Sequence, residues 1–152
     1  MVRWLTATVA ALVLLLPSTA LAGSSRDESA LLREMNRVRA THGLPPLRAD
    51  LHLERAARAH TSTMLSTGVF RHGAFDRRME RFDVHGRLAG ENLAWGSGSR
   101  GTPRAIVGAW LASPPHRANL LRASFRRVGV GDRVGSFQGV GDAHVVTADF
   151  AG

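Results

Sequence analysis

The order of the periodic segments is the feature that most constrains the fold of this chain. Early in the sequence, Leu31, Met35 and Val38 recur at i, i+4 and i+7, which is the spacing of one apolar helix face. Near the end, Arg127 to Val134 and Ala143 to Ala151 are short segments rich in valine and glycine, as in strands. Because helical patterns come first and strand patterns last, we predict an α+β layered domain rather than a βαβ fold.

Local start and stop residues divide the chain into further elements. Capping residues precede the helical patterns, and glycine or proline follows them. The loop from Gly135 to Asp142 joins the two final strands, which we expect to form an antiparallel hairpin. The other expected elements are a helix from the cap Asp27 to His42, a helix from the cap Asp50 to Thr67, a short helix from Phe75 to Phe82, an irregular or extended segment from Leu88 to Trp95, a loop from Gly96 to Gly101, a helix from the cap Thr102 to Ser113, and a turn or short helix from His116 to Leu121.

The amino terminus has the three-part pattern of a secretory signal. Arg3 supplies a positive charge, residues 5–16 are almost entirely apolar, and Ala20-Leu21-Ala22 provides the small residues that a signal peptidase needs. The apolar run is only about half of the ~20 residues that span a bilayer. We therefore predict a signal peptide over residues 1–22, a secreted domain over residues 23–152, and no transmembrane segment after cleavage.

Composition limits the chemistry that this chain can perform. It has 152 residues and no cysteine, which excludes disulfides, thiolate metal sites and cysteine nucleophiles. Its 20 basic residues are all arginine and give a net charge of +8, and arginine without lysine is typical of a GC-rich bacterial source. No aromatic residues interleave with the arginines, so we expect no specific nucleic-acid site. Charge alone predicts attraction to an anionic cell-envelope polymer.

The seven histidines fall into two groups. His72 and His116 lie in predicted loops beside glycine or proline, and loops held on a rigid scaffold are where function concentrates. The other histidines need no functional explanation. We expect His42, His52 and His85 to be exposed to solvent and His60 to be buried in the core, and His144 can lie on either face of its strand.

Glu91 is the acidic candidate. Its neighbours in the sequence are small or apolar, so the pattern does not indicate a solvent-exposed side of the segment for its side chain. A partly buried carboxylate needs a charged or hydrogen-bonding partner, and an imidazole is a suitable one. Glu91 can instead bond backbone N–H groups of its own loop, and spacing alone favours this simpler role. Two histidines and a carboxylate can form an open zinc site, but separations in sequence do not show one.

Ser113 and His116 stand at i and i+3, a spacing that suits a nucleophile and its base. The chain has no Gly-x-Ser-x-Gly elbow, however, and a serine before Pro114 is more simply a helix end.

Several sequence blocks occur in a fixed order between residues 31 and 151. They are Asn36-x-x-Arg39 with Gly43-Leu44-x-x-Leu47, Ala56-x-x-x-His60, Gly68-x-Phe70-x-His72, Gly90-Glu91-Asn92-Leu93-Ala94, Trp110-x-x-Ser113-Pro114-x-His116-Arg117-x-Asn119-Leu120-Leu121, and Phe125-x-x-Val128-Gly129-Val130-Gly131. In this order they resemble the CAP superfamily, the cysteine-rich secretory, antigen-5 and pathogenesis-related-1 proteins. The similarity is greatest to small bacterial secreted members.

The resemblance implies a three-layer α-β-α sandwich, for which we expect an antiparallel sheet, with a central cleft. In the family, two histidines and one or two acidic residues face that cleft, and the histidines can bind a divalent metal, often zinc. The matching positions are His72, Glu91 and His116, with His72 and His116 as metal ligands. Accessory positions are His60, Ser113, Arg117 and Asn119.

This chain departs from the family pattern at three places. Ser113 stands near the point where eukaryotic members carry a second acidic residue, and Ala148 stands where the family often has glutamine. Arg71 replaces a serine of the bacterial members. Each departure weakens the case for hydrolytic chemistry.

Three classes of function remain open from the sequence. The first is a secreted domain that binds a divalent metal or a small, peptide or lipid ligand. The second is a metal-assisted hydrolase acting on peptide or cell-envelope polymer, and the third is a lipid- or sterol-binding or non-catalytic envelope protein. Neither a nucleophilic serine elbow nor a complete metal triad is evident, so we do not expect a conventional enzyme. We also expect a monomer.

Overall fold

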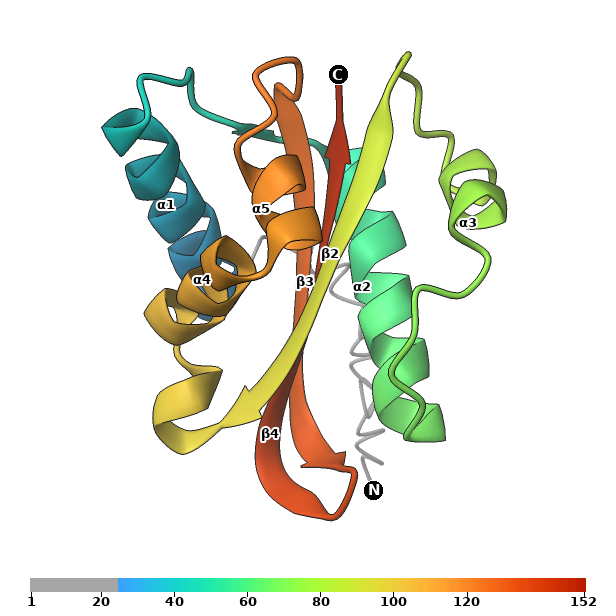
Figure 1. The fold of residues 1–152 in the computed structure, drawn as a ribbon. Helices are drawn as coiled ribbons and strands as arrows, with labels where there is room; N and C mark the ends of the chain where they lie inside the picture. Colours follow the sequence, from blue (N-terminus) through green and yellow to red (C-terminus); the bar gives the residue numbers. More distant parts are fainter. Residues whose placement is uncertain (1–24) are drawn as a thin grey trace, which may run out of the picture.

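The computed structural model describes residues 25–152 and has three layers, with a sheet between two groups of helices (Figure 1). The predicted signal peptide, residues 1–22, lies outside the described residues. In chain order the elements are α1 (Arg26–Thr41), β1 (Arg48–Ala49), α2 (Leu51–Thr67), α3 (Phe75–Arg81), β2 (Ala89–Ser97), the 3-10 helix η1 (Gly98–Gly101), α4 (Pro103–Ala112), α5 (Pro114–Leu120), β3 (Arg127–Phe137) and β4 (Val140–Ala151).

The α-β-α sandwich is confirmed, but its sheet is mixed rather than purely antiparallel. Within residues 25–152 the strand order is β1-β3-β4-β2, and both β2 and β3 pair with β4 in the antiparallel sense. The short strand β1 pairs with β3 in the parallel sense, with Arg48 opposite Arg127. The expectation of an antiparallel sheet is therefore wrong at this one edge, because the extended chain after Pro45-Pro46 runs alongside β3 in the same direction.

Two segments that were expected to be loop, irregular or extended are largely regular strand. The segment expected to be irregular or extended, residues 88–95, is extended, and from Ala89 it belongs to β2, which pairs with β4 from Ala89 opposite Ala151 to Ser97 opposite Ala143. The loop expected over residues 135–142 is mostly strand, and only a tight turn at Gln138 and Gly139 separates β3 from β4. Pairing with a neighbouring strand decides these conformations, and local propensity is a weak guide to it.

The helix boundaries follow their capping residues. Asp50 caps α2 by accepting from the His52 and Leu53 amides, as expected, and Thr102 caps α4. The expected cap Asp27 is wrong. Ser25 caps α1 instead, since its hydroxyl accepts from the Glu28 amide while the Glu28 carboxylate accepts from the Ser25 amide, a reciprocal capping box.

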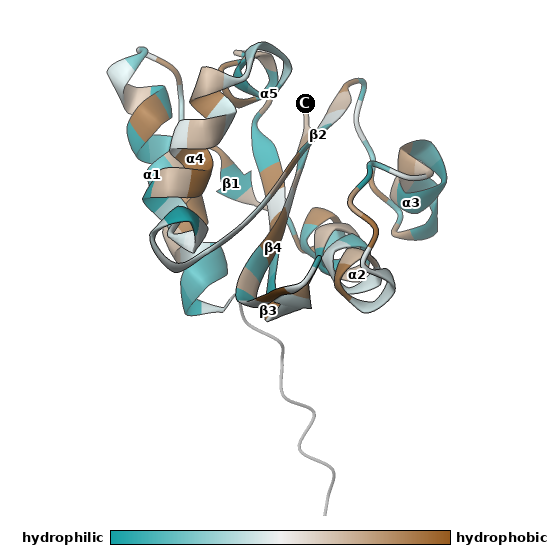
Figure 2. Cartoon of the chain, turned by 60° about the horizontal axis from the view of Figure 1, so that its bottom comes forward, coloured by the Kyte–Doolittle hydropathy of each residue, from teal (hydrophilic) through white to brown (hydrophobic). Residues whose placement is uncertain are grey.

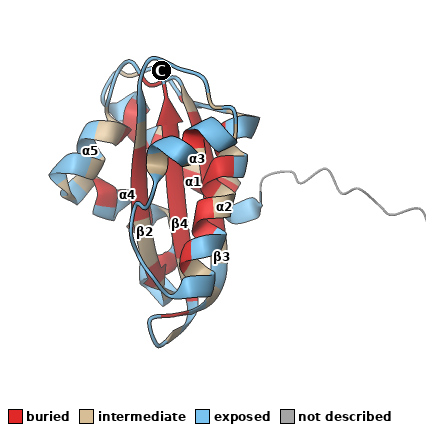
Figure 3. Cartoon of the chain, turned by 90° about the vertical axis from the view of Figure 1, so that its right-hand side faces the viewer, coloured by how far each residue is buried: buried red, intermediate tan, exposed pale blue. Residues whose placement is uncertain are grey.

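The helices divide between the two faces of the sheet, with α1, α4 and α5 on one side and α2 and α3 on the other (Figure 2). The strands between them are largely buried (Figure 3). On the α2 face, Gly129 and Gly131 let the helix lie directly against β3, because a Cβ at Gly129 would come within 1.9 Å of the Leu53 backbone. No helix in the described part of the chain is long and apolar enough to cross a membrane.

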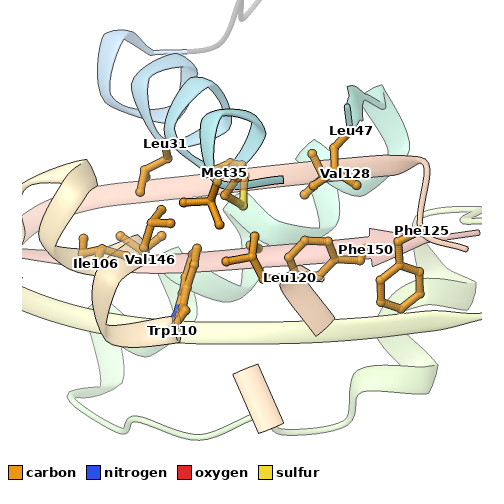
Figure 4. Packing of buried hydrophobic residues seen from close by; sticks show 14 residues of the cluster. Leu31, Met35, Leu47, Ile106, Trp110, Leu120, Phe125, Val128, Val146 and Phe150 are labelled. Carbon is orange, nitrogen blue, oxygen red and sulfur yellow. The ribbon is translucent and has the colours of Figure 1, made fainter. Parts of the chain in front are cut away.

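The main apolar layer lies between the sheet and the helices α1, α4 and α5. Trp110 is 1% exposed within it, and its indole N–H donates to the Leu93 carbonyl at 2.9 Å. This placement fits a structural anchor rather than a ligand platform. The layer also contains Leu31, Met35, Leu47, Ile106, Leu120, Phe125, Val128, Val146 and Phe150 (Figure 4).

Candidate functional site

Glu91 lies at the centre of a polar cluster on the face of the sheet opposite the main apolar layer. It stands on the edge strand β2, and its side chain is 3% exposed. One carboxylate oxygen is 2.6 Å from Nδ1 of His72, and the other contacts the guanidinium of Arg78. When Glu91 is ionised, its carboxylate only accepts, and the contact then places a proton of His72 on Nδ1. Glu91 thus has both a charged and an imidazole partner, and its carboxylate bonds side chains distant in the sequence rather than its own loop, which spacing alone had favoured.

Arg78 and Asp149 complete this cluster, and the sequence analysis did not identify either. Arg78, on α3, also donates to an Asp149 oxygen at 3.4 Å, and Asp149 is fully buried on β4 directly opposite Glu91. Alternation along β4 could have found Asp149, because it shares the inward phase of Val145 and Thr147. Arg78 carries no such signal, being one arginine of many.

The buried carboxyl pair has unusual acid–base properties. Burial raises the pKa of Glu91 to about 7, although the charge of Arg78 opposes the shift. Burial also raises the pKa of Asp149 well above its ordinary value; Arg78 opposes this shift, and the Glu91 carboxylate adds to it. Two carboxyl groups therefore share one guanidinium, and we expect the pair to retain a proton at neutral pH. Among the described residues, one Asp149 oxygen and Nε of Arg78 have no hydrogen-bond partner.

His60 is the buried core histidine that the apolar face of its helix predicts. It is 8% exposed, and its Nε2 is 2.9 Å from the Arg71 carbonyl oxygen, to which it donates. The same nitrogen is 3.7 Å from Glu91, so His60 borders the cluster without a close bond to it. Burial, together with the charge of Arg78, lowers the pKa of His60 to about 4, which keeps the ring neutral.

His116 approaches from the other side of the edge strand, on α5. Its Nδ1 lies 2.9 Å from the Ser113 hydroxyl, and its backbone carbonyl accepts from the Asn92 side chain at 2.9 Å. Asn119 strengthens this attachment by donating to the Glu91 backbone carbonyl at 3.1 Å. Helix α5 is thus attached to β2 at the position of Glu91. Burial and the charge of His72 lower the pKa of His116.

The expected site residues therefore differ in how closely the structure brings them together. Glu91 bonds His72 directly, whereas His116 reaches this region through α5 and does not bond Glu91. Arg117 lies elsewhere, on a groove of about 370 Å³ between α4 and α5 that is lined mainly by apolar residues. The Ser113–His116 contact is real, but among the described residues no carboxylate bonds the imidazole to orient it as a base.

The imidazoles of His72 and His116 are donors that suit a borderline metal such as zinc. His72 and His116 each use Nδ1 in a hydrogen bond, to Glu91 and Ser113 respectively, and a ring that donates through Nδ1 keeps the lone pair of Nε2 for a metal. Histidine ligands commonly donate their second ring N–H to a carboxylate or another acceptor in this way. Two imidazoles would leave the remaining coordination positions to solvent or a ligand. Within residues 25–152, a grouping of three such ligand side chains occurs elsewhere, at Asp27, Asp132 and His144.

The fold and this cluster define a CAP-type domain, and comparison with known proteins supports the same conclusion. Residues 32–150 match the family model described as the cysteine-rich secretory protein family, CAP. The chain therefore belongs to the CAP family and is of the bacterial type, although it contains no cysteine.

Relatives occur in bacteria and in humans. The chain is 35% identical to the uncharacterized protein YkwD of Bacillus subtilis over 113 residues, which are 70% of this chain and 42% of YkwD. It is 28% identical over 89 residues to the human Golgi-associated plant pathogenesis-related protein 1, covering 59% of this chain and 52% of that protein. This chain thus spans only about half of these relatives or less.

Solved structures share the fold. An extracellular protein of Bacillus anthracis containing an SCP domain superposes with a TM-score of 0.70 at 28% identity, covering 82% of this chain and 40% of that one. An outer surface protein of Borrelia burgdorferi gives a TM-score of 0.69 at 23% identity, covering 82% and 90%. At that identity the second likeness concerns the fold alone.

Proposed function

We propose that this CAP domain is a secreted binding protein whose cleft holds a divalent cation, best zinc, between His72 and His116. The observation that carries the proposal is the 2.6 Å contact between the buried Glu91 carboxylate and Nδ1 of the exposed His72. That contact fixes the tautomer and orientation of the ring, so that Nε2 is the nitrogen available to a metal. When bound, zinc would polarise a ligand oxygen or a coordinated water.

Binding is favoured over hydrolysis by the way in which the carboxyl groups are used. Both oxygens of Glu91 already bond protein groups, His72 and Arg78, and Asp149 is fully buried. A general base must reach the proton that it removes. Here the carboxyl pair instead orients an imidazole and holds a proton beneath the cleft.

Secretion is supported by the amino-terminal signal pattern and by a structural relative described as an extracellular protein. We propose a small, peptide or lipid molecule as the organic ligand that completes the metal coordination. Anionic envelope polymer would be attracted by the net charge of +8.

Zinc calorimetry of the full chain tests this proposal. The single variants His72→Ala and His116→Ala should each lose the same bound zinc equivalent, because each lacks one of its two histidine ligands. Glu91→Gln should weaken that equivalent by about 10–100-fold, as loss of a group that orients a ligand does. His85→Ala is the matched control, since the His85 side chain is 84% exposed and pairs with Asp83 instead. If both cleft variants bind as many zinc equivalents as the parent, the cleft metal site is wrong.

A further inference from the structure

A second cluster of ligating side chains lies on the face of the sheet opposite the cleft. It comprises Asp132 on β3, His144 on β4 and Asp27 in the first turn of α1. One ligand atom from each of the three lies within 4.8 Å of the others. Asp132 lies on the same face of β3 as Val128 and Val130, which pack in the apolar layer with α1. The carboxylates of Glu91 and Asp149 lie on the opposite face of the sheet, on the α2 side.

The imidazole and the buried carboxylate are already positioned by the fold. Asp132 is paired with Val146 and Val134 with His144, so Asp132 and His144 are diagonal neighbours on one face of the hairpin. Nδ1 of His144 lies 3.0 Å from one Asp132 oxygen and 3.2 Å from the other. The ring also packs on Gly101, where a Cβ would come within 2.8 Å of it. Glycine at this position therefore leaves room for the imidazole beside Asp132.

Negative charge gathers around this cluster. Asp132 is 7% exposed, Asp27 offers a carboxylate oxygen within 4.8 Å of it, and the backbone N–H of Asp132 donates to the Glu28 carboxylate at 3.4 Å. The guanidinium groups of Arg58 and Arg133 pair with Glu28, at 2.7 and 3.4 Å. Arg133 donates to the backbone carbonyl of Asp132 and not to its carboxylate. A cation between Asp132 and Asp27 would be attracted by these carboxylates.

We infer that Asp27, Asp132 and His144 form a second divalent-cation site, which takes zinc or a similar transition-metal ion. Calcium and magnesium take sets made up of oxygen ligands, whereas an imidazole nitrogen beside carboxylates suits zinc and its neighbours. Bond lengths of about 2.0–2.2 Å place the ligands of a tetrahedral zinc about 3.3–3.6 Å apart. Nδ1 of His144 and the Asp132 oxygen are hydrogen-bonded at 3.0 Å, so a metal between them would replace the shared proton and widen their separation by a few tenths of an ångström. Asp27 is exposed, so its side chain can rotate to close the set, and a fourth position stays open to water.

The test uses the full chain carrying His72→Ala and His116→Ala, so that the cleft does not contribute. Zinc calorimetry of this double variant should still detect one bound equivalent. Adding Asp27→Asn should weaken that equivalent by at least about tenfold, and His144→Gln should do the same, since each removes a direct ligand. Asp27 is exposed, so Asp27→Asn should fold, and thermal unfolding without zinc checks this.

Asp76→Asn is the matched control, because Asp76 is also an exposed acid in the first turn of a helix, α3. It should leave zinc binding unchanged. The inference is overturned if the cleft-deficient chain binds no zinc, or if Asp27→Asn and His144→Gln bind it as tightly as that chain. This experiment and that of the proposed function can fail independently. If the cleft proposal is wrong, the single variants His72→Ala and His116→Ala bind as many zinc equivalents as the parent, whatever the result at Asp27 and His144.

Discussion

Two buried arginines organise opposite sides of this molecule in different ways. Arg39 is fully buried beside the main apolar layer, and its guanidinium donates only to backbone carbonyls, those of Pro45, Leu120, Arg122 and Phe125. Arg78, whose side chain is 9% exposed, instead serves two carboxyl groups, and its Nε has no partner among the described residues.

The difference separates a structural use of charge from a chemical one. Neutral carbonyls around Arg39 do not titrate, so that arginine joins α1 to the segment between α5 and β3 at any ordinary pH. The carboxyl groups around Arg78 have raised pKa values, so the charge of that cluster changes near neutrality. Perturbed titratable groups of this kind collect at functional sites.

Replacing Arg39 should have the largest effect on stability. Arg39→Met keeps much of the apolar stem but removes a donor from four backbone carbonyls, of which those of Arg122 and Phe125 keep a second one, and we expect a loss of about 3–5 kcal/mol. Urea unfolding measures it. Arg37→Met, which removes an exposed arginine paired with Glu34, should cost less than about 1 kcal/mol. Equal losses in the two variants would contradict the structural role of Arg39.

Replacing Arg78 should have a smaller effect that depends on pH. Without the guanidinium, Glu91 and Asp149 must stay protonated in the folded state, whereas both ionise in the unfolded chain above their ordinary pKa values. A folded pKa above the unfolded one contributes stability at low pH that is lost as pH rises. We therefore expect Arg78→Met to cost about 2–3 kcal/mol at pH 8 and clearly less at pH 5.

Urea unfolding at the two pH values measures this difference. Arg77→Met, in the adjacent and exposed position, is the control and should show little effect at either pH. A loss from Arg78→Met that is the same at pH 5 and pH 8 would mean that the carboxyl pair does not titrate in this range.

Replacing His60 should have the smallest effect on stability, and this effect should change with pH in the direction opposite to that of Arg78→Met. Its pKa is lowered to about 4 in the folded chain, so between the ordinary value of 6.5 and 4 the unfolded chain binds a proton that the folded chain does not. His60 therefore loses stabilising effect as pH falls, by up to about 1.4 kcal/mol per pH unit. His60→Gln retains an N–H donor without titration, so the stability difference between parent and variant should shift by about 1–2 kcal/mol between pH 7 and pH 5. His85→Gln, at an exposed position, should show no such shift.

Much of the local structure was predictable, because its signals lie within a few residues of one another. The caps Asp50 and Thr102 are side chains that bond amides two or three residues away, and Gly68 ends α2 in the left-handed conformation that glycine adopts readily. Trp110 lies at i+4 from Ile106 and i+3 from Val107, the spacing of one helical face, and all three are buried. The cap of α1 was misassigned because Ser25 and Asp27 are both good capping residues, and only the reciprocal bond with Glu28 distinguishes them.

The candidate site was only partly predictable. Resemblance to the CAP family identified His72, Glu91 and His116, and the structure bonds the first two directly. Arg78 and Asp149 were missed because their significance depends on Glu91, which is far from both in the sequence. The orientation of His144 was left open for the same reason, since Asp132 on the neighbouring strand decides it.

The sequence by itself determined which segments are helices, where most of them begin and end, and which family the blocks resemble, because those properties depend on neighbouring residues and on ordered motifs. Only the tertiary structure decided that β2 is a regular strand, that β1 runs parallel to β3, and which charges meet inside the molecule. Strand pairing and buried ion pairs are contacts between distant segments, and their energy comes from burial that exists only after the chain has folded.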